Sequence, residues 1–336
     1  MTDIAVSGRD WAQVLLGYRQ PKASRSLLEI AMTAAPLAAL WTAAWLLVHF
    51  HQWWGLALTV PAAFFLVRLF MIQHDCGHGA FFKSRWANDW VGRVAGVFTL
   101  TPYDYWKRTH AIHHGTHGNL DRRELGGIEL LTVAEYQALS PLRRMLYRLY
   151  RHPVILFGLG PAYLFVFQHR IPVGEMRRMR PWVEIMLTNL AIAAVAAGAI
   201  LIAGVGPFLM VHLPIVLMGA TIGVWLFYVQ HQFEHAHWKR NDEWDLHEAA
   251  LQGSSHYDLP NPLRWLTANI GVHHVHHLNS RIPFYRLPQI LKDHPRLREV
   301  KRLTLRESLA CVPLTLWDER SERMMTFRQA KLAYAK

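Results

Sequence analysis

The chain has 336 residues, of which 52% are hydrophobic. A soluble core spaces its apolar residues periodically, whereas here they form long uninterrupted runs, which argues against a soluble protein. The formal net charge of +12 would suit nucleic acid, but no nucleic-acid-binding motif accompanies it, so we expect no nucleic acid partner.

The N-terminal part predicts one membrane hairpin. Because the first 25 residues are polar and charged, we expect no cleavable signal peptide and take Met1 as the start of the mature chain. Residues 26–50 contain no Lys or Arg, and a second apolar run follows at 55–67. About 20 helical residues cross the hydrocarbon layer, so we predict transmembrane helices at about 27–50 and 55–73.

A second hairpin is predicted between Trp182 and Trp238, where Lys and Arg are absent. A central Lys or Arg costs roughly 2.5–3.5 kcal/mol on insertion scales, so this absence indicates helices in the bilayer. The break GVGP divides the segment into spans at about 183–203 and 208–230. The shorter apolar segments 91–102 and 153–167 are predicted to be interfacial or re-entrant, which gives four spans rather than six.

The basic residues lie on one side of the predicted membrane. Both hairpin tips lack Lys and Arg, so the positive-inside rule places both termini and two cap segments, 74–181 and 231–336, in the cytoplasm. We therefore expect a single all-α integral membrane domain over residues 1–336. The polar tail after about residue 289 is predicted to be helical.

Histidines cluster in three boxes among the 21 in the chain. HDCGH holds His74 and His78, HAIHH holds His110, His113 and His114, and HHVHH holds His273, His276 and His277. Residues three and four apart share one face of a helix, so each box aims its imidazoles at a common point. Eight such ligands would complete two metal ions with four to five ligands each.

The histidines outside the three boxes differ in whether they have a partner at ligand spacing. The segment YVQHQFEHAHW contains His231 and His235, four apart, and one or both are predicted to supply a further ligand. His274 points away from its neighbours and is expected to support them, while His117 and His237 are expected to be supporting or surface groups. Those at the opposite membrane face or without a partner at ligand spacing are His49, His51, His152, His169, His212, His247, His256 and His294.

The residues of the boxes favour redox chemistry with O2 over hydrolysis. Imidazole suits iron, copper, zinc and nickel alike, so ligand type alone does not choose the metal. Hydrolytic two-metal sites usually include a bridging carboxylate, and none is evident, because Asp75 lies on a different helical face from His74 and His78. The two cysteines, Cys76 and Cys311, are not expected to form a disulfide on the cytoplasmic side.

The three boxes and their flanks resemble the membrane fatty acid desaturase superfamily. GNLDRR, LQGSSHYDLP and NIGVHHVHHLNSRIPFYRLP are similar to bacterial acyl-lipid desaturases of the omega-6 type, over most of residues 68–290, and this likeness implies a bacterial inner membrane as the location. This resemblance implies a di-iron enzyme that uses O2 and two electrons to place a double bond in a fatty acyl chain, which the likeness suggests is lipid-linked. It assigns the iron ligands to the eight box histidines, with His231 or His235 as a ninth.

Other residues could support this chemistry. Asp75, Glu234 and Asp258 could orient the ligands. Trp106, Trp225, Phe227 and Tyr228 could wall an acyl tunnel or belong to an interfacial aromatic belt. The chain has no HPGG haem motif, no GxGxxG fingerprint and no cysteine set for an iron–sulfur cluster, so we expect an external donor, a ferredoxin or a small cytochrome.

Two alternatives remain open from the sequence. A related di-iron hydroxylase or ketolase acting on a lipid would share the boxes and the topology. A histidine-rich metal transporter would instead place its ligands within the bilayer together with buried acids, which the predicted spans hardly contain. The position of the double bond and the acyl carrier are not encoded in these motifs.

Overall fold

The computed structural model describes residues 7–123 and 127–334, and four of its helices are long and apolar enough to cross a membrane. They are α2 (Ala23–His49), α3 (Thr59–Gly77) with the short helix η2 (Trp53–Leu58) before it, α9 (Met179–Ala203) and α10 (Val205–His231). The bounds agree with the four predicted spans to within a few residues, so the predicted all-α membrane architecture is confirmed. The predicted start at Met1 lies outside the described residues.

The four helices differ in how much of their surface the protein covers. Half of the most apolar stretch of α3 is buried, because α3 packs between α2 and α10. In α9 only 6% of that stretch is buried, which leaves its apolar side chains for lipid. Gly204 joins α9 to α10 with a φ of 80°, a left-handed conformation that glycine adopts without a steric penalty.

The two shorter apolar segments do not cross a membrane. Residues 91–102 belong mainly to the amphipathic helix α4 (Arg85–Phe98), whose exposed Trp86, Trp90, Val94 and Phe98 recur every four residues. Residues 153–167 form one turn of π-helix, η3 (Ile155–Leu159), followed by α8 (Gly160–Val166). Among the described residues the number of spans is therefore four, as predicted.

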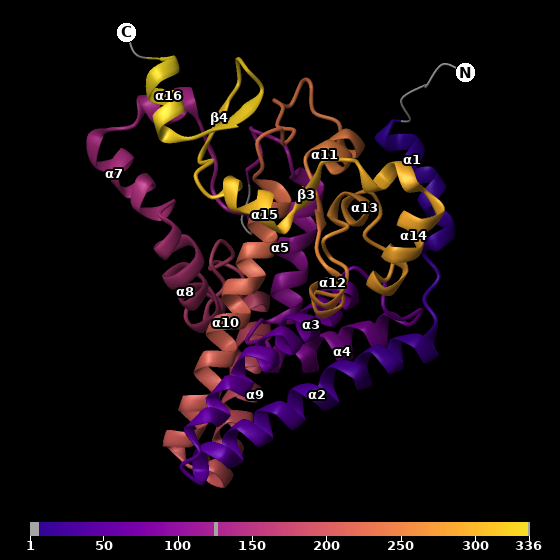
Figure 1. Ribbon diagram of the computed structural model, residues 1–336, viewed down its shortest axis with the longest axis vertical. Helices are drawn as coiled ribbons and strands as arrows, with labels where there is room; N and C mark the ends of the chain where they lie inside the picture. The colour runs from indigo at the N-terminus through magenta and orange to yellow at the C-terminus, as the bar shows by residue number, and fades with distance from the viewer. Residues whose placement is uncertain (1–6, 124–126, 335–336) are drawn as a thin grey trace.

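A cap of short elements covers one end of the membrane helices (Figure 1). Its α-helices are α1 (Gly8–Val14), α5 (Tyr103–Thr116), α6 (Val133–Ala138), α7 (Pro141–Tyr150), α11 (Leu246–Gln252), α12 (Asn261–Leu266), α13 (His273–Leu278), α14 (Leu287–Asp293), α15 (Leu305–Ser308) and α16 (Phe327–Ala333). Its 3-10 turns are η1 (Leu15–Tyr18), η4 (Gln168–Arg170), η5 (Phe284–Arg286), η6 (Pro295–Arg298) and η7 (Leu309–Cys311).

Five strands of two or three residues tie the cap together. β1 (Leu131–Thr132) pairs in parallel with β4 (Leu316–Asp318), which pairs antiparallel with β5 (Arg323–Met325). β2 (His256–Asp258) pairs in parallel with β3 (Arg302–Thr304). The tail after residue 289 is thus not purely helical as expected, because strands this short leave no alternating pattern to recognise in the sequence.

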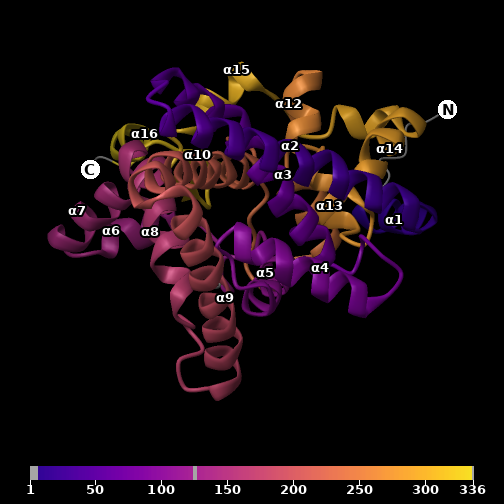
Figure 2. The same ribbon diagram turned by 90° about the horizontal axis from the view of Figure 1, so that it is seen from below.

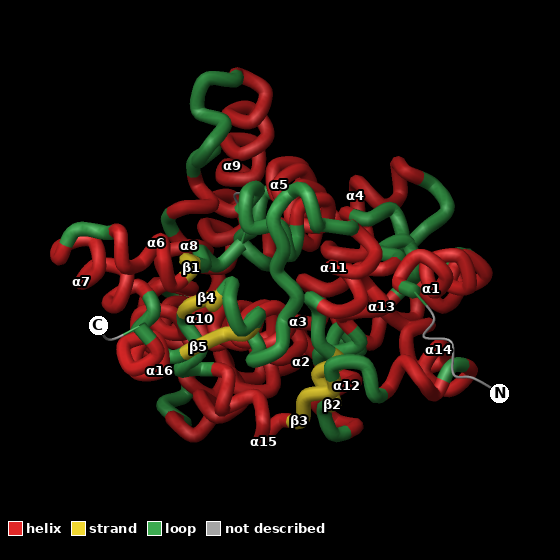
Figure 3. Tube along the Cα trace, turned by 90° about the horizontal axis from the view of Figure 1, so that it is seen from above, coloured by secondary structure: helices red, strands yellow, loops and turns green. Residues whose placement is uncertain are grey.

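The cap helices pack against the ends of the membrane helices α3 and α10. Helix α5 packs against α3 and α4, and seen from below it lies beside α4 (Figure 2). Seen from above, α11 and α13 lie side by side and pack against each other, while α7 stands at the edge of the molecule (Figure 3). The main core of buried apolar side chains runs through these cap elements and the ends of α3 and α10.

Candidate metal centre

Four helices carry the histidine boxes to one point. His74 lies in the last turn of α3, and His78 directly follows that helix. The second box occupies the last two turns of α5, the third forms α13, and His231 is the last residue of α10. Because α3, α5 and α10 all end at this point, the negative ends of their dipoles face it, which favours a bound cation.

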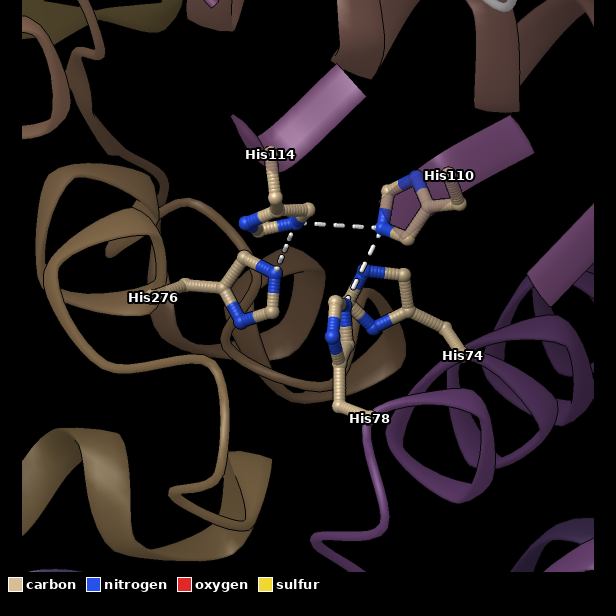
Figure 4. Close-up of side chains that lie close together, drawn as sticks. All are labelled: His74, His78, His110, His114 and His276. Carbon is tan, nitrogen blue, oxygen red and sulfur yellow. Dashed lines mark hydrogen bonds between the residues drawn. The ribbon is translucent and has the colours of Figure 1, made fainter. Parts of the chain in front are cut away.

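The first group contains five histidines (Figure 4), namely His74, His78, His110, His114 and His276, and one ring nitrogen of each lies within 4.8 Å of the others. The Nε2 atom of His110 lies 3.1 Å from that of His78 and 3.2 Å from that of His114. The Nε2 atom of His276 lies 3.2 Å from that of His114. Three segments that are far apart in the sequence therefore converge here.

The second group is adjacent and is built in the same way. The Nε2 atom of His231 lies 3.1 Å from that of His113 and 3.0 Å from that of His273. His113, His117 and His231 form one set of converging nitrogens, and His231, His273 and His277 form another. All eight box histidines thus fall into two neighbouring groups, with His231 joining the second.

Hydrogen bonding among the imidazoles does not explain this geometry. A neutral imidazole nitrogen is either a donor or an acceptor, yet Nε2 of His110 and Nε2 of His114 each face two other Nε2 atoms. Imidazole nitrogens that bind a metal at 2.0–2.1 Å at right angles to one another would lie about 3 Å apart. Nε2 of His277 is buried without a partner among the described residues. These clusters can bind metal.

Burial keeps the ligands outside the membrane helices neutral. It lowers the pKa of His78, His110, His114 and His276 well below 6.5, and the neighbouring histidines lower it further. The same causes lower the pKa of His113, His273 and His277, while burial lowers that of His117 to about 4. A neutral imidazole is the form that binds a metal ion.

One of the three suggested carboxylates contacts a box histidine. Asp75 is buried, its Oδ1 lies 3.4 Å from Nδ1 of His74, and its Oδ2 accepts a hydrogen bond of 2.7 Å from the Phe284 amide. Such a contact fixes which nitrogen of His74 points at the cluster. Glu234 is half exposed near Arg323, and Asp258 pairs with Arg264 and Arg302, so among the described residues neither orients a ligand.

The structure does not bring His235 to the cluster. Helix α10 ends at His231, and Gln232 leaves the helical conformation, so the spacing of four no longer places His235 on the same face. His235 is exposed and lines a separate polar cavity with His237. As a predicted ligand His235 therefore has no geometric support, whereas His231 does.

His117 is the site residue that sequence reasoning missed. It is buried, its ring centroid lies 4.2 Å from that of His231, and its Nε2 donates to the Gly253 carbonyl at 2.9 Å. With the proton on Nε2, the lone pair on Nδ1 remains for the second group. The available signal was its spacing of four residues from His113, which holds because α5 continues to Thr116.

The third box owes its position to a close approach of two backbones. Gly271 lies directly against Tyr257 of β2. A Cβ at this position would lie 2.2 Å from the Tyr257 carbonyl oxygen, so only glycine fits without a shift of the backbone. The Tyr257 amide donates to the Gly271 carbonyl at 2.7 Å, so α13 begins at a fixed place. His274 is fully buried with its ring 5.7 Å from that of His256, on the side away from the cluster, as predicted.

An apolar cavity of about 640 Å³ reaches the first group. His74, His110 and His273 line one part of it, and it continues between α3 and α10 past Leu66, Val216, Gly219 and Gly223. Its volume is typical of ligand sites. Of the four aromatic residues suggested as tunnel walls, Trp106 and Phe227 line the cavity. Trp225 instead donates to the Tyr257 hydroxyl, and Tyr228 donates to the Cys311 carbonyl.

Comparison with known proteins agrees with this site. A family model for fatty acid desaturases matches residues 51–307, which include all three boxes. Over 328 residues, 98% of this chain and 93% of the relative, the sequence is 44% identical to a fatty acid desaturase of Bacillus subtilis. The chain belongs to the fatty acid desaturase family. It is an integral membrane protein, and its activity is that of an oxidoreductase acting on fatty acyl chains.

Two further desaturase relatives come from Synechocystis. One, an sn-1 oleoyl-lipid 12-desaturase, is 28% identical over 280 residues, which cover 80% of this chain and 75% of the relative. The other, an sn-1 acyl-lipid omega-3 desaturase (ferredoxin), is 28% identical over 227 residues, 65% of this chain and 61% of the relative. Membership of this family argues against the metal-transporter alternative, because histidine clusters of this kind are typical of desaturases.

Proposed function

We propose that this desaturase uses O2, two external electrons and two iron ions to place a double bond in a lipid-linked acyl chain. The first iron would be held by His74, His78, His110, His114 and His276. The second would be held by His113, His231, His273 and His277, with His117 in place of the predicted His235. The observation that carries the proposal is the convergence of these ring nitrogens into two adjacent groups.

The donor set fits iron in a redox role. The ligands are all imidazoles, and within the described residues no carboxylate bridges the two groups, which separates the site from hydrolytic two-metal centres. Bound iron would supply the activation of O2 that an unactivated methylene requires. The protein's own contribution is to hold the ions, exclude water and position the chain.

Named side chains perform these tasks. Trp106 stacks on His110 with centroids 4.4 Å apart, so an apolar wall directly adjoins the first group. Asp75 would orient His74 through the contact of its Oδ1 with Nδ1 of that ring at 3.4 Å. The apolar cavity would hold the acyl chain in an extended path beside both, because few polar side chains interrupt its lining.

A lipid-linked substrate is supported by where the cavity opens. Leu159 and Tyr163 line the cavity and are also 62% and 59% exposed, on the apolar surface beside α10. An acyl chain in the bilayer could therefore enter sideways. The names of the Synechocystis relatives specify acyl-lipid and oleoyl-lipid substrates, which favours the same class here.

The electrons must come from outside the chain. Its two cysteines, Cys76 and Cys311, are buried, and two thiolates are fewer than the four that hold an iron–sulfur cluster. The name of one relative specifies ferredoxin, so we propose a ferredoxin or a small cytochrome as donor. The distribution of Lys and Arg supports a cytoplasmic site with both termini on that side.

The test is product analysis after replacement of a single ligand. His276→Ala should abolish the unsaturated product in an expressing host while the protein remains in the membrane. His49→Ala, at the far tip of α2, should leave the product unchanged. Gas chromatography with mass spectrometry of the host lipids measures both. Full activity of His276→Ala would refute the ligand assignment, and a hydroxylated product from the wild type would select the hydroxylase alternative.

A further inference from the structure

Helix α7 carries an apolar face that the protein does not cover. Leu142, Met145, Leu146 and Leu149 are 51–61% exposed and recur at intervals of three and four residues, so they share one side of the helix. The opposite side is anchored, since Tyr147 is buried and its hydroxyl donates to the Thr315 carbonyl at 2.8 Å. The helix is thus held to the cap by one side and presents the other outward.

The charged residues of α7 are all basic. Pro141–Tyr150 contains three arginines, Arg143, Arg144 and Arg148, and no Asp or Glu. Arg148 donates to the hydroxyl of Tyr136, which packs on Tyr147, at 2.6 Å, and Arg144 donates to the Leu139 carbonyl at 2.9 Å, so these two guanidinium groups contact the cap. Leucines flanked by arginines are the pattern of a helix that lies among lipid headgroups, with its basic groups near the phosphates.

The apolar face of α7 continues onto the lipid-facing surface. The chain runs directly from α7 into η3 and α8 (Figure 1), where Val154, Leu159, Tyr163 and Phe167 are 59–64% exposed. This segment packs beside α10, and the Thr221 hydroxyl donates to the Phe157 carbonyl at 2.8 Å. Exposed apolar side chains therefore recur from the segment beside α10 to α7, with the exposed His152 between the two groups.

We propose that α7 lies in the membrane interface with this face inserted into the lipid. The occupant is the bilayer, and the depth expected for such a helix is roughly 5–10 Å below the headgroups. From the sequence, 141–150 is part of the predicted cytoplasmic cap segment 74–181, without a membrane contact of its own. With α7 in the interface, the cavity opening at Leu159 and Tyr163 lies beneath it in lipid, which gives an acyl chain direct access. The proposal needs the membrane helices but not the iron chemistry.

Depth-dependent fluorescence quenching tests the location of α7. The full chain is reconstituted in vesicles of phosphatidylcholine and phosphatidylglycerol, with a polarity-sensitive label on Leu146→Cys. Two matched variants give the references, Leu190→Cys on the lipid-facing α9 and Leu332→Cys on α16, both at exposed leucines. The native Cys76 and Cys311 are buried, and the unsubstituted chain measures their background labelling.

The outcomes separate lipid from water and from protein. We expect nitroxide-bearing phosphatidylcholine to quench the Leu146 label as it does the Leu190 label, while iodide in the buffer quenches only the Leu332 label. Iodide quenching of the Leu146 label equal to that of the Leu332 label would overturn the proposal. So would iodide quenching that disappears only when the electron-donor protein is added, because the face would then be a protein interface.

Discussion

The Nε2 atoms of His113 and His231 lie 3.1 Å apart, although 118 positions separate the two residues in the chain. This contact joins the end of α5 to the end of the last membrane helix. It means that the second histidine group forms only when α10 packs against the cap. Metal binding and the docking of the cap onto the membrane helices should therefore be coupled.

The choice between His117 and His235 is directly testable. His117→Ala should lower the iron content of the purified protein and its activity by at least about tenfold, since it removes a ligand or its support. His235→Ala should retain both, because His235 is exposed outside the cluster. Iron analysis of the two variants purified in parallel decides the matter, and the opposite ranking would restore His235 to the site.

Asp75 should act on iron affinity through His74. Asp75→Asn keeps the shape and an acceptor for the Phe284 amide but removes the charge that faces Nδ1 of His74. We expect the affinity for iron to fall by about 10–100-fold. Competition with a chelator measures this fall, and Glu234→Gln is the matched control at a carboxylate that contacts no ligand. Equal affinities in the two variants would show that Asp75 is only structural.

Gly223 should limit the depth of the acyl cavity. It lines the cavity, a Cβ there would meet no atom within 4 Å, and it lies about 10 Å along α10 from Gln230. Gly223→Leu would fill this space without a backbone clash, so the enzyme should favour acyl chains with fewer carbons beyond the reacting bond. Product chain lengths and double-bond positions report the change. Gly198→Leu, on α9 with equally open space, should have none, and an unchanged profile in Gly223→Leu would remove this part of the cavity from the substrate path.

The metal-free protein should lose stability as the pH falls. The pKa of His117 is about 4 in the fold against 6.5 as the ordinary value, and those of His110 and His114 are also lowered. Below about pH 6.5 the histidines of the unfolded chain are protonated while the buried histidines of the folded chain stay neutral, so acid favours unfolding. For His117 alone the free energy of unfolding should fall by on the order of 3 kcal/mol by pH 4. Thermal unfolding of chelator-treated protein in detergent between pH 8 and pH 5 measures it, and a melting temperature that rises on acidification would contradict the burial of neutral imidazoles.

The sequence predicts the membrane helices and the boxes for different physical reasons. The spans follow from contiguous apolar residues, because the bilayer penalises each charge within it. The boxes follow from spacings of three and four, which hold wherever a helix is continuous. His110 and His114 satisfy that condition on α5, and His117, which directly follows the helix, keeps its spacing of four from His113 although from the sequence it is expected to be a supporting or surface group.

The failures occur where a helix ends or where contacts are non-local. His235 keeps the right spacing from His231, but α10 ends between them. Asp75 contacts His74 through side-chain torsions that a helical wheel does not represent. The short strands β1 and β4 pair across 185 positions, from Leu131 to Leu316, and two residues carry no periodicity that could announce such a pairing.

The central claim is that two adjacent groups of imidazoles each hold an iron ion. X-ray absorption together with metal analysis of purified, active wild-type protein tests it most directly. We expect two irons per chain, with nitrogen-rich coordination typical of imidazole and a nearby second metal. Full desaturase activity in protein that contains one iron or none would contradict it.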